Sequence, residues 1–249
     1  MSERLYLEMG KATRPEIEAF VARCPVAIVP MGSTEQHGPH LPTATDTIIA
    51  EAIALRTAEK SMGLVLPAQP LGYAWVWKGV PASLTMNFDS YVKMVHDIAE
   101  SLETWGVKAV YFLSGHGANP QVIKHALRET ISDKIEVKVL YGMYQGIGEM
   151  MAEAESDDWL GDLHADEIET SLMLALSPDL VHMDKAVRDY PEAPADYGQS
   201  EESMRHLMNT GVFGDATLAT REKGERWLEL AADRSAAFWL NFLKRHDLN

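Results

Sequence analysis

The polar segment at residues 31–42 carries side chains of the kind that bind metal ions. It follows directly on an apolar run at 26–31, and it contains Glu35 and His37. In an extended chain, residues two apart project to the same side, so this carboxylate and this imidazole can reach one metal ion or two adjacent ones. Asp46 follows at the expected start of a helix, where its carboxylate can bridge two cations. The alternative is that Glu35 and His37 are surface residues and that Asp46 only caps the helix.

A second candidate ligand, His116, lies in the segment 114–119, which again follows a strongly apolar run. Glycines on both sides, Gly115 and Gly117, let the backbone turn sharply while the imidazole points into a cleft. Asn119 then suits a helix N-cap. Taken alone, this motif fits a polar turn equally well. Two such loops favour a binding site, because ligands in open α/β sheets bind beyond the carboxyl ends of the strands.

The third cluster, at 164–171, contains His164, Glu167 and Glu169. If the segment is helical throughout, His164 and Glu167 share a face, while Glu169 projects about 140° away from His164 at roughly 100° per residue. If the helix begins only near Asp166, this distinction weakens. The alternative is a charge cluster at a helix N-terminus, which the helix dipole favours without any metal.

Short apolar runs alternate with stretches of helical period along the chain, and this alternation indicates how the three loops are positioned. Short runs rich in Val, Ile and Leu predict strands at 26–31, 64–69, 107–113 and 137–141. Stretches of helical period predict helices at 46–60, 88–105, 119–131, 168–176 and 222–243. Strands that alternate with helices build a parallel sheet covered by helices, so the predicted fold class is α/β. The irregular regions 72–87 and 184–213 are expected to be functional loops.

Composition narrows the class of protein further. The 249 residues are 46% hydrophobic and show no linker, which predicts one domain over 1–249. A net charge of -15 argues against a nucleic-acid partner. No signal peptide and no stretch of roughly 20 apolar residues is visible, and the single Cys24 fits a reducing compartment. We therefore expect a soluble, cytoplasmic protein that binds neither nucleic acid nor membrane. Carboxylate and imidazole ligands suit Zn, Mn or Fe(II), and one cysteine excludes a multi-thiolate site.

The motifs resemble those of the creatininase (creatinine amidohydrolase) family, and the likeness spans nearly the whole chain. It rests on five segments in the same order: Gly32-Ser33-Thr34-Glu35-Gln36-His37-Gly38, Pro81-Ala82-Ser83-Leu84-Thr85, Ser114-Gly115-His116-Gly117-Ala118-Asn119, His164-Ala165-Asp166-Glu167-Ile168-Glu169-Thr170-Ser171 and Gly211-Val212-Phe213-Gly214-Asp215. The first motif is highly specific, and the others gain weight from their order. The resemblance implies a three-layer αβα fold with a mostly parallel central sheet and assembly into a homohexamer.

The resemblance also implies a dinuclear metal centre. Glu35, His37, Asp46 and His116 match the positions of the family's metal ligands, with Asp46 bridging two divalent ions. The ions expected from the ligand chemistry are Zn, Mn or Fe.

One departure from the family pattern concerns the residues after the ligand histidine. Creatininase itself carries Tyr and a metal-binding Glu there, whereas this chain has Gly117 and Ala118, which argues against creatinine as the substrate. Family members that share the Gly-His-Gly form carry a Glu at the position of Glu167. We therefore predict that Glu167 supplies the missing carboxylate.

The predicted activity is metal-dependent hydrolysis. Two cations about 3.5–4 Å apart lower the pKa of a bridging water and polarise a substrate carbonyl, so that a metal-bound hydroxide attacks the carbonyl carbon. His164 is the candidate for carrying the proton to the leaving group, because an imidazole titrates near roughly pH 6.5. The alternative is a hydrogen-bonded structural histidine. Glu169 either orients that imidazole or reaches a metal itself.

Three functions follow from these patterns. The main hypothesis is hydrolysis of a small cyclic amide at a non-peptide C–N bond. The second is ring-opening hydrolysis of a carbocyclic diketone such as 3-dehydro-scyllo-inosose in inositol catabolism. Members of the family that resemble this chain perform that reaction. The third is a metal-binding scaffold without turnover. Trp75, Trp77 and Lys78, in the first long loop, are predicted to line the substrate pocket.

Overall fold

A five-stranded parallel sheet forms the centre of the computed structural model, which describes residues 5–128, 135–161 and 163–248. In spatial order the strands are β1 (Tyr6–Glu8), β3 (Gly63–Val65), β2 (Val26–Met31), β4 (Ala109–Ser114) and β5 (Lys138–Met143). All four neighbouring pairs are parallel. The carboxyl ends of the strands therefore lie along one edge of the sheet.

Strands β2 and β4 bring the first two candidate loops together. Both are buried along their whole length. They pair in register from Val26 opposite Ala109 to Met31 opposite Ser114, so they end side by side. The chain that leaves each strand must turn away at the same place, which makes the segments 32–44 and 115–118 neighbours.

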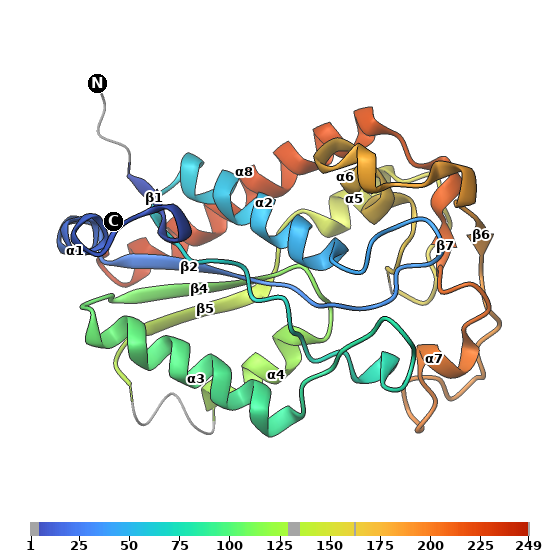
Figure 1. Ribbon diagram of the computed structural model, residues 1–249, viewed down its shortest axis with the longest axis horizontal. Helices are drawn as coiled ribbons and strands as arrows, with labels where there is room; N and C mark the ends of the chain where they lie inside the picture. Colours follow the sequence, from blue (N-terminus) through green and yellow to red (C-terminus); the bar gives the residue numbers. More distant parts are fainter. Residues whose placement is uncertain (1–4, 129–134, 162, 249) are drawn as a thin grey trace.

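Helices cover both faces of the sheet, which gives the three-layer arrangement expected from the sequence (Figure 1). On one face lie α2 (Thr45–Lys60), α6 (Glu167–Leu176) and α8 (Arg221–Arg245). On the other lie α3 (Phe88–Thr104) and α4 (Asn119–Ala126). Because parallel strands are shielded on both sides, nearly every residue in β2 and β4 is apolar.

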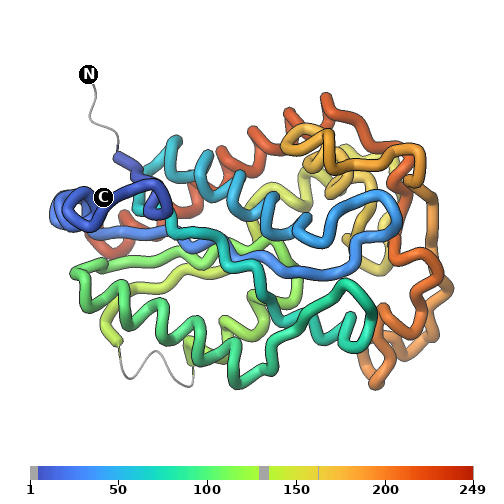
Figure 2. The backbone as a smooth tube through the Cα atoms, in the orientation of Figure 1, coloured from blue at the N-terminus to red at the C-terminus, as the bar shows by residue number. Residues whose placement is uncertain are grey.

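The remaining elements lie at the two ends of the molecule. β1 and the last turn of α8 are at one end (Figure 2). The other end is wrapped by the long loop before α8, which carries three short elements, β6 (Arg188–Asp189), α7 (Met204–Leu207) and β7 (Gly214–Asp215). The rest are α1 (Arg14–Arg23), α5 (Ile147–Glu153) and the 3-10 turn η2 (Trp75–Trp77). No helix among the described residues combines the length and apolarity needed to cross a lipid bilayer.

Most predicted elements are present, with differences that have local causes. The strand predicted at 64–69 ends at Val65, since Pro67 lacks the N–H that a longer ladder would need, and Gln69 rejoins β2 only at an isolated bridge to Met31. The helix predicted at 119–131 is α-helical from Asn119 to Ala126 and continues as a π-helical turn at 127–128, and positions 129–131 lie outside the described residues. α1 was not predicted, because it buries only Phe20 and Val21 and so shows no apolar stripe.

The two long loops pack against each other in a small hydrophobic cluster separate from the main core. From the first loop it contains Ala74 and Trp77, and from the second Met204 and Phe213, with Trp159 between them. Such satellite clusters commonly form under long loops. This one builds the wall of the candidate site described below.

Helix α8 crosses α6 at Gly224, where a side chain would not fit. A Cβ atom at this position would lie 1.8 Å from the carbonyl oxygen of Ser171. We expect Gly224→Ala to lower the free energy of unfolding by about 1–3 kcal/mol, since the two helices must separate. Urea denaturation measures this. As a control, Gly148→Ala places a methyl group in open space on α5 and should be neutral or slightly stabilising. Equal midpoints for the two variants would contradict the close approach.

Candidate metal centre

Five candidate ligands from distant parts of the chain meet beyond the carboxyl ends of β2 and β4. Glu35 and His37 lie in the loop after β2, His116 in the loop after β4, Asp46 in the first turn of α2, and Glu169 in the first turn of α6. All five side chains are buried, with exposed fractions of 8% or less. Buried charges of this kind require partners.

Asp46 stands between two imidazoles. Its Oδ1 lies 3.0 Å from Nε2 of His37, and its Oδ2 lies 3.1 Å from Nδ1 of His116. Glu35 Oε2 is 3.2 Å from the same His116 nitrogen, and Glu169 Oε2 is 3.5 Å from His37 Nε2. Besides the group Glu35–His37–His164, two groups of potential ligands result here, Glu35–Asp46–His116 and His37–Asp46–Glu169, each with its ligand atoms within 4.8 Å of one another. Asp46 belongs to both, as a bridging carboxylate must.

The donor atoms fit cations better than they fit one another. Within the described chain, Nε2 of His37 and Oδ2 of Asp46 are shielded from solvent and make no hydrogen bond. Their short contacts therefore lack hydrogen-bond alignment, and a buried polar atom without a partner costs about 1–3 kcal/mol. Lone pairs that converge on a common point are the arrangement that a divalent ion needs. The residues present thus fit a pair of such ions.

The electrostatics of the centre also favour positive charge. Burial opposes protonation of His37, but the carboxylates of Asp46 and Glu169 outweigh it and hold the pKa of this imidazole well above its usual range. Glu35 and Asp46 do the same for the pKa of His116 against the effect of burial. Burial would raise the pKa of Asp46, yet the two imidazoles hold it below its usual range. Without metal, protons neutralise the carboxylates, and divalent cations can replace those protons.

Close backbone packing brings α2 to the loop after β4. A Cβ at Gly115 would lie 2.3 Å from the backbone oxygen of Asp46, so only glycine allows this approach. The sharp turn predicted around Gly115 and Gly117 is present at 115–118, although neither glycine adopts the left-handed conformation. Asn119 does not act as an N-cap. It is the first residue of α4, and its side chain donates to Gly32 O at 3.0 Å, which ties the two loops together.

The structure places the carboxylate of Glu167, a predicted ligand, away from the other candidate ligands. Lys223 Nζ donates to its Oε1 at 2.6 Å, and the backbone N–H groups of Glu155 and Ser156 donate to its Oε2 at 2.9 and 2.7 Å. This carboxylate is therefore fully occupied away from the centre. Helix α6 begins only at Glu167, so His164 precedes the helix and the two residues do not share a helical face.

Glu169 takes the position that was expected for Glu167. Asp166 caps α6 by accepting the N–H groups of Ile168 and Glu169, at 2.9 and 3.1 Å. From the first turn, Glu169 reaches back and accepts the N–H of Ala165 with Oε2 at 2.6 Å. Of its two predicted roles, the geometry favours the metal ligand, because the same oxygen faces His37.

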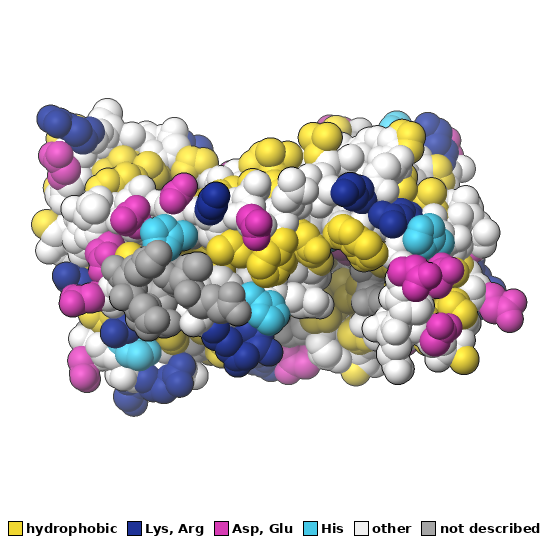
Figure 3. Space-filling view, turned by 90° about the horizontal axis from the view of Figure 1, so that it is seen from below, with side chains coloured by type: hydrophobic (Ala, Val, Ile, Leu, Met, Phe, Trp, Pro, Cys, Tyr) yellow, Lys and Arg dark blue, Asp and Glu magenta, His cyan; other side chains and the backbone are white. Residues whose placement is uncertain are grey.

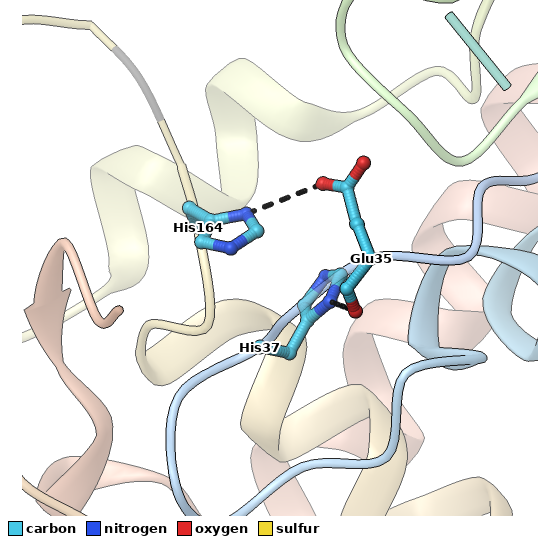
Figure 4. Close-up of side chains that lie close together, drawn as sticks. All are labelled: Glu35, His37 and His164. Carbon is cyan, nitrogen blue, oxygen red and sulfur yellow. Dashed lines mark hydrogen bonds and ion pairs between the residues drawn. The ribbon is translucent and has the colours of Figure 1, made fainter. Parts of the chain in front are cut away.

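His164 presents one ring nitrogen to the centre. Its Nε2 lies 2.8 Å from the backbone carbonyl of Gln36, to which it donates in the tautomer protonated at Nε2. In the other tautomer Nε2 accepts from the Gln36 amide nitrogen, which lies 2.9 Å away and also donates to Gly211 O. Nδ1 is left facing Oε1 of Glu35 at 3.7 Å (Figure 4). Burial and the neighbouring His37 lower the pKa of His164.

Four of the five candidate ligands, all except His37, line one cavity of about 520 Å³. Its wall includes Glu35, Asp46, His116, Glu169 and the proposed proton carrier His164. Aromatic and apolar residues complete it, among them Trp75, Trp77, Met143, Tyr197 and Met204. Lys78, which was also predicted to line the pocket, is not part of this wall. Figure 3 shows the surface hollowed beside the end of the molecule that carries α7.

Two residues that support Glu35 were not recognised from the sequence. Ser33 Oγ donates to Oε2 of Glu35 at 2.7 Å, and Trp77 Nε1 donates to Oε1 at 3.0 Å. Trp77 was expected in the pocket wall, but nothing in its sequence context indicates a hydrogen bond to a residue 42 positions away.

Comparison with known proteins places this geometry in context. Residues 10–239 match the family model described as creatininase, creatinine amidohydrolase. A creatinine amidohydrolase of Pseudomonas putida is 31% identical over 247 residues, which cover 92% of this chain and 94% of that protein. A mycofactocin precursor peptide peptidase of Mycolicibacterium smegmatis is 30% identical over 226 residues, covering 88% and 84%. A 3-dehydro-scyllo-inosose hydrolase of Thermotoga maritima is 26% identical over 247 residues, covering 89% and 78%.

Solved structures agree with this assignment. A crystal structure of creatinine amidohydrolase matches with a TM-score of 0.82 at 29% identity, covering 97% of this chain and 99% of that one. A mutant creatininase of the Zn-Zn type and an Mn creatininase both match with TM-scores of 0.81, at 29% and 30% identity and with equally broad coverage. The layered fold, the order of the motifs and the convergence of carboxylates and imidazoles all lead to one conclusion. The chain belongs to the creatininase family of hydrolases.

Proposed function

We propose that this hydrolase uses two divalent cations to cleave an amide C–N bond in a small cyclic substrate. Glu35, Asp46 and His116 would hold one cation, and His37, Asp46 and Glu169 the other. The observation that carries the proposal is Asp46, whose two oxygens face imidazoles of different ligand groups inside a single cavity. Zn and Mn are the first candidates, because the matching creatininase structures are described as Zn-Zn and Mn forms.

The cations would supply an activated water and a polarised carbonyl. The chain's own residues then handle orientation and the proton. The lowered pKa of His164 favours its neutral imidazole. In the tautomer that donates Nε2–H to the Gln36 carbonyl, Nδ1 can accept a proton and pass it to the leaving nitrogen. The aromatic wall displaces water from the bound substrate.

The choice of an amide rests on the relatives, and the chain departs from creatininase in its ligand set. The Pseudomonas relative is named for creatinine, and a mutant creatininase structure is described in complex with creatine. Here Ala118 offers no carboxylate after the ligand histidine, and Glu169 stands in for it from another element. The cavity also has room for a substrate larger than a single five-membered ring. We therefore propose a cyclic amide other than creatinine.

A second candidate is ring-opening hydrolysis of a carbocyclic diketone. It is supported by the similarity to the 3-dehydro-scyllo-inosose hydrolase of Thermotoga maritima. The same activated water would attack a ring carbonyl, and His164 would then protonate carbon rather than nitrogen. A metal-loaded scaffold without turnover is the third possibility, which the activity assays below address.

The proposal extends to cellular context. We propose that residues 1–249 form one hydrolase domain, and that it acts in the cytoplasm as a homohexamer. Family resemblance supports the assembly, and the single cysteine supports the compartment. Light scattering measures the number of chains.

The ligand set is tested by comparing two glutamates in the same helical turn. We expect Glu169→Gln to lower bound metal from two ions toward one per chain, since a ligand carboxylate is lost. Glu167→Gln should retain both ions but unfold at a lower temperature, because Lys223 loses its buried partner. Mass spectrometry of gel-filtered protein measures the metal. Equal metal loss in both variants, or loss only in Glu167→Gln, would refute the assignment of Glu169.

Cation binding should release protons and weaken at low pH. Because the pKa values of His37 and His116 are raised in the metal-free chain, both imidazoles are protonated at neutral pH and must lose that proton to bind metal. We expect proton release on adding Zn²⁺, and an apparent affinity that falls as the pH drops below neutrality. A pH indicator in weakly buffered solution records the release. Affinity independent of pH, without proton release, contradicts these two ligand roles.

The role of His164 is tested with metal content held constant. His164→Asn should lower kcat by about 10²–10⁴-fold while both ions remain bound. His182→Asn, at an exposed histidine outside the cavity, serves as the matched control. Activity is measured on cyclic amides, oxidised inositols and short peptides, before and after chelation and with Mn or Zn restored. A ring-opened keto acid as product selects the second candidate. Failure of the metal-loaded wild type to turn over any of them favours the scaffold.

A further inference from the structure

Trp77 contacts both a candidate metal ligand and the candidate proton carrier. Its indole N–H donates to Oε1 of Glu35 at 3.0 Å. Its ring lies 4.6 Å from the ring of His164, centroid to centroid, with a tilt of 35°. The side chain is only 1% exposed, yet it forms part of the cavity wall. A substrate in the cavity would therefore touch the same ring that holds these two groups.

The two carboxylate oxygens of Glu35 have different partners, and the hydrogen bond from Trp77 is made to only one of them. Oε2 lies beside His116 and accepts Ser33 Oγ–H at 2.7 Å, and it belongs to the ligand group shared with Asp46. Oε1 points to the other side, toward Trp77 and His164. With a donor on each oxygen, the carboxylate cannot rotate about its last bond without losing both hydrogen bonds. Glu35 is thereby held ready to offer Oε2 to a cation.

The same indole fixes the plane of His164. The imidazole is sandwiched between Trp77 at 4.6 Å and His37 at 4.4 Å, and its Nε2 is bonded to the backbone of Gln36. Ring contacts on both sides and one hydrogen bond at the edge leave a single orientation. Nδ1 is then directed at the space beside Glu35, where a reacting group would lie.

Trp77 is in turn held by the second long loop. Its ring lies 5.9 Å from that of Phe213, and both belong to the small hydrophobic cluster that joins the loops. Phe213 also pairs through its backbone with His164, whose carbonyl accepts the Phe213 N–H at 3.0 Å. Trp77 is therefore packed into the cluster that joins the two long loops.

We propose that Trp77 is a positioning residue that sets Glu35 for cation binding through its N–H and sets His164 for proton transfer through its ring. The proposal rests on the two-metal function above. It assigns the two roles to different parts of one side chain, which makes them separable by mutation. Phenylalanine keeps an aromatic face but lacks the N–H, and leucine lacks both.

The experiment measures Co²⁺ binding and kinetics in Trp77→Phe and Trp77→Leu. We expect both variants to bind Co²⁺ at the Glu35 site about 10–100-fold more weakly, the loss found when partners of metal ligands are removed. At saturating metal, kcat should fall by less than about threefold in Trp77→Phe but by tenfold or more in Trp77→Leu, because only leucine removes the ring contact with His164. A chromogenic chelator in competition reports the affinity.

Fluorescence reports whether the cation binds close to Trp77. Co²⁺ bound beside Glu35 should quench the emission of Trp77, so Trp77→Phe should lose most of the quenching that wild type shows. Trp159→Phe is the matched control, since Trp159 lies in the same cluster and donates its N–H to Pro191 O at 2.7 Å rather than to a ligand. It should keep wild-type affinity and quenching. Ser33→Ala, which removes the hydrogen bond to Oε2 of Glu35, should weaken Co²⁺ binding as Trp77→Phe does.

The outcomes separate this proposal from the function on which it rests. Wild-type Co²⁺ affinity in Trp77→Phe, or equal losses in Trp77→Phe and Trp159→Phe, would overturn the positioning role even if the enzyme is active. If the wild type binds two cations but hydrolyses nothing, the proposed function fails, and the affinity and quenching data still decide whether Trp77 positions Glu35. Equal kcat at saturating metal in Trp77→Leu and wild type would remove the role assigned to the ring.

Discussion

The structure depends on the burial of three carboxylates and two imidazoles around one shared aspartate. Taking charged groups out of water costs several kcal/mol each unless opposite charge or hydrogen bonds compensate. Here the carboxylates of Glu35, Asp46 and Glu169 face imidazoles that burial alone would keep neutral. Protons or divalent cations must therefore occupy the centre for the fold to be stable. The buried carboxylates that need positive charge for stability are also the groups that would bind the metal.

Close contacts between backbone segments, at positions where a side chain would not fit, bring the charged groups of the centre together. Parallel strands β2 and β4 end together, so their loops start as neighbours. Gly115 lets α2 approach closely enough to insert Asp46, and Asn119 ties the loop after β2 to the start of α4. Neither Gly115 nor Asn119 is a candidate ligand. They set distances of about 3 Å between groups from three elements, where an error of one ångström would disrupt the centre.

The carboxylates of the centre come from three different elements. Glu35 lies in the loop after β2, Asp46 in α2 and Glu169 in α6, opposite His37. The loop after β4 contributes His116 but, with Ala118 two residues later, no carboxylate. Gly117 and Ala118 of that loop line the cavity instead.

The sequence by itself determined the α/β class, the ends of β2, the helix at α2 and four of the candidate ligands, Glu35, His37, Asp46 and His116. These features depend on local periodicity and on short motifs, which the chain carries wherever it folds. Only the tertiary structure shows that Glu169, and not Glu167, faces the other candidate ligands. Each residue of shift in a helix start rotates a side chain by about 100°, and the start of α6 is set by the Asp166 cap and by Lys223, which draws Glu167 away from 56 positions further along the chain. The hydrogen bond from Trp77 to Glu35 likewise arises only when two long loops pack together, because neither loop has a regular pattern from which its contacts could be read.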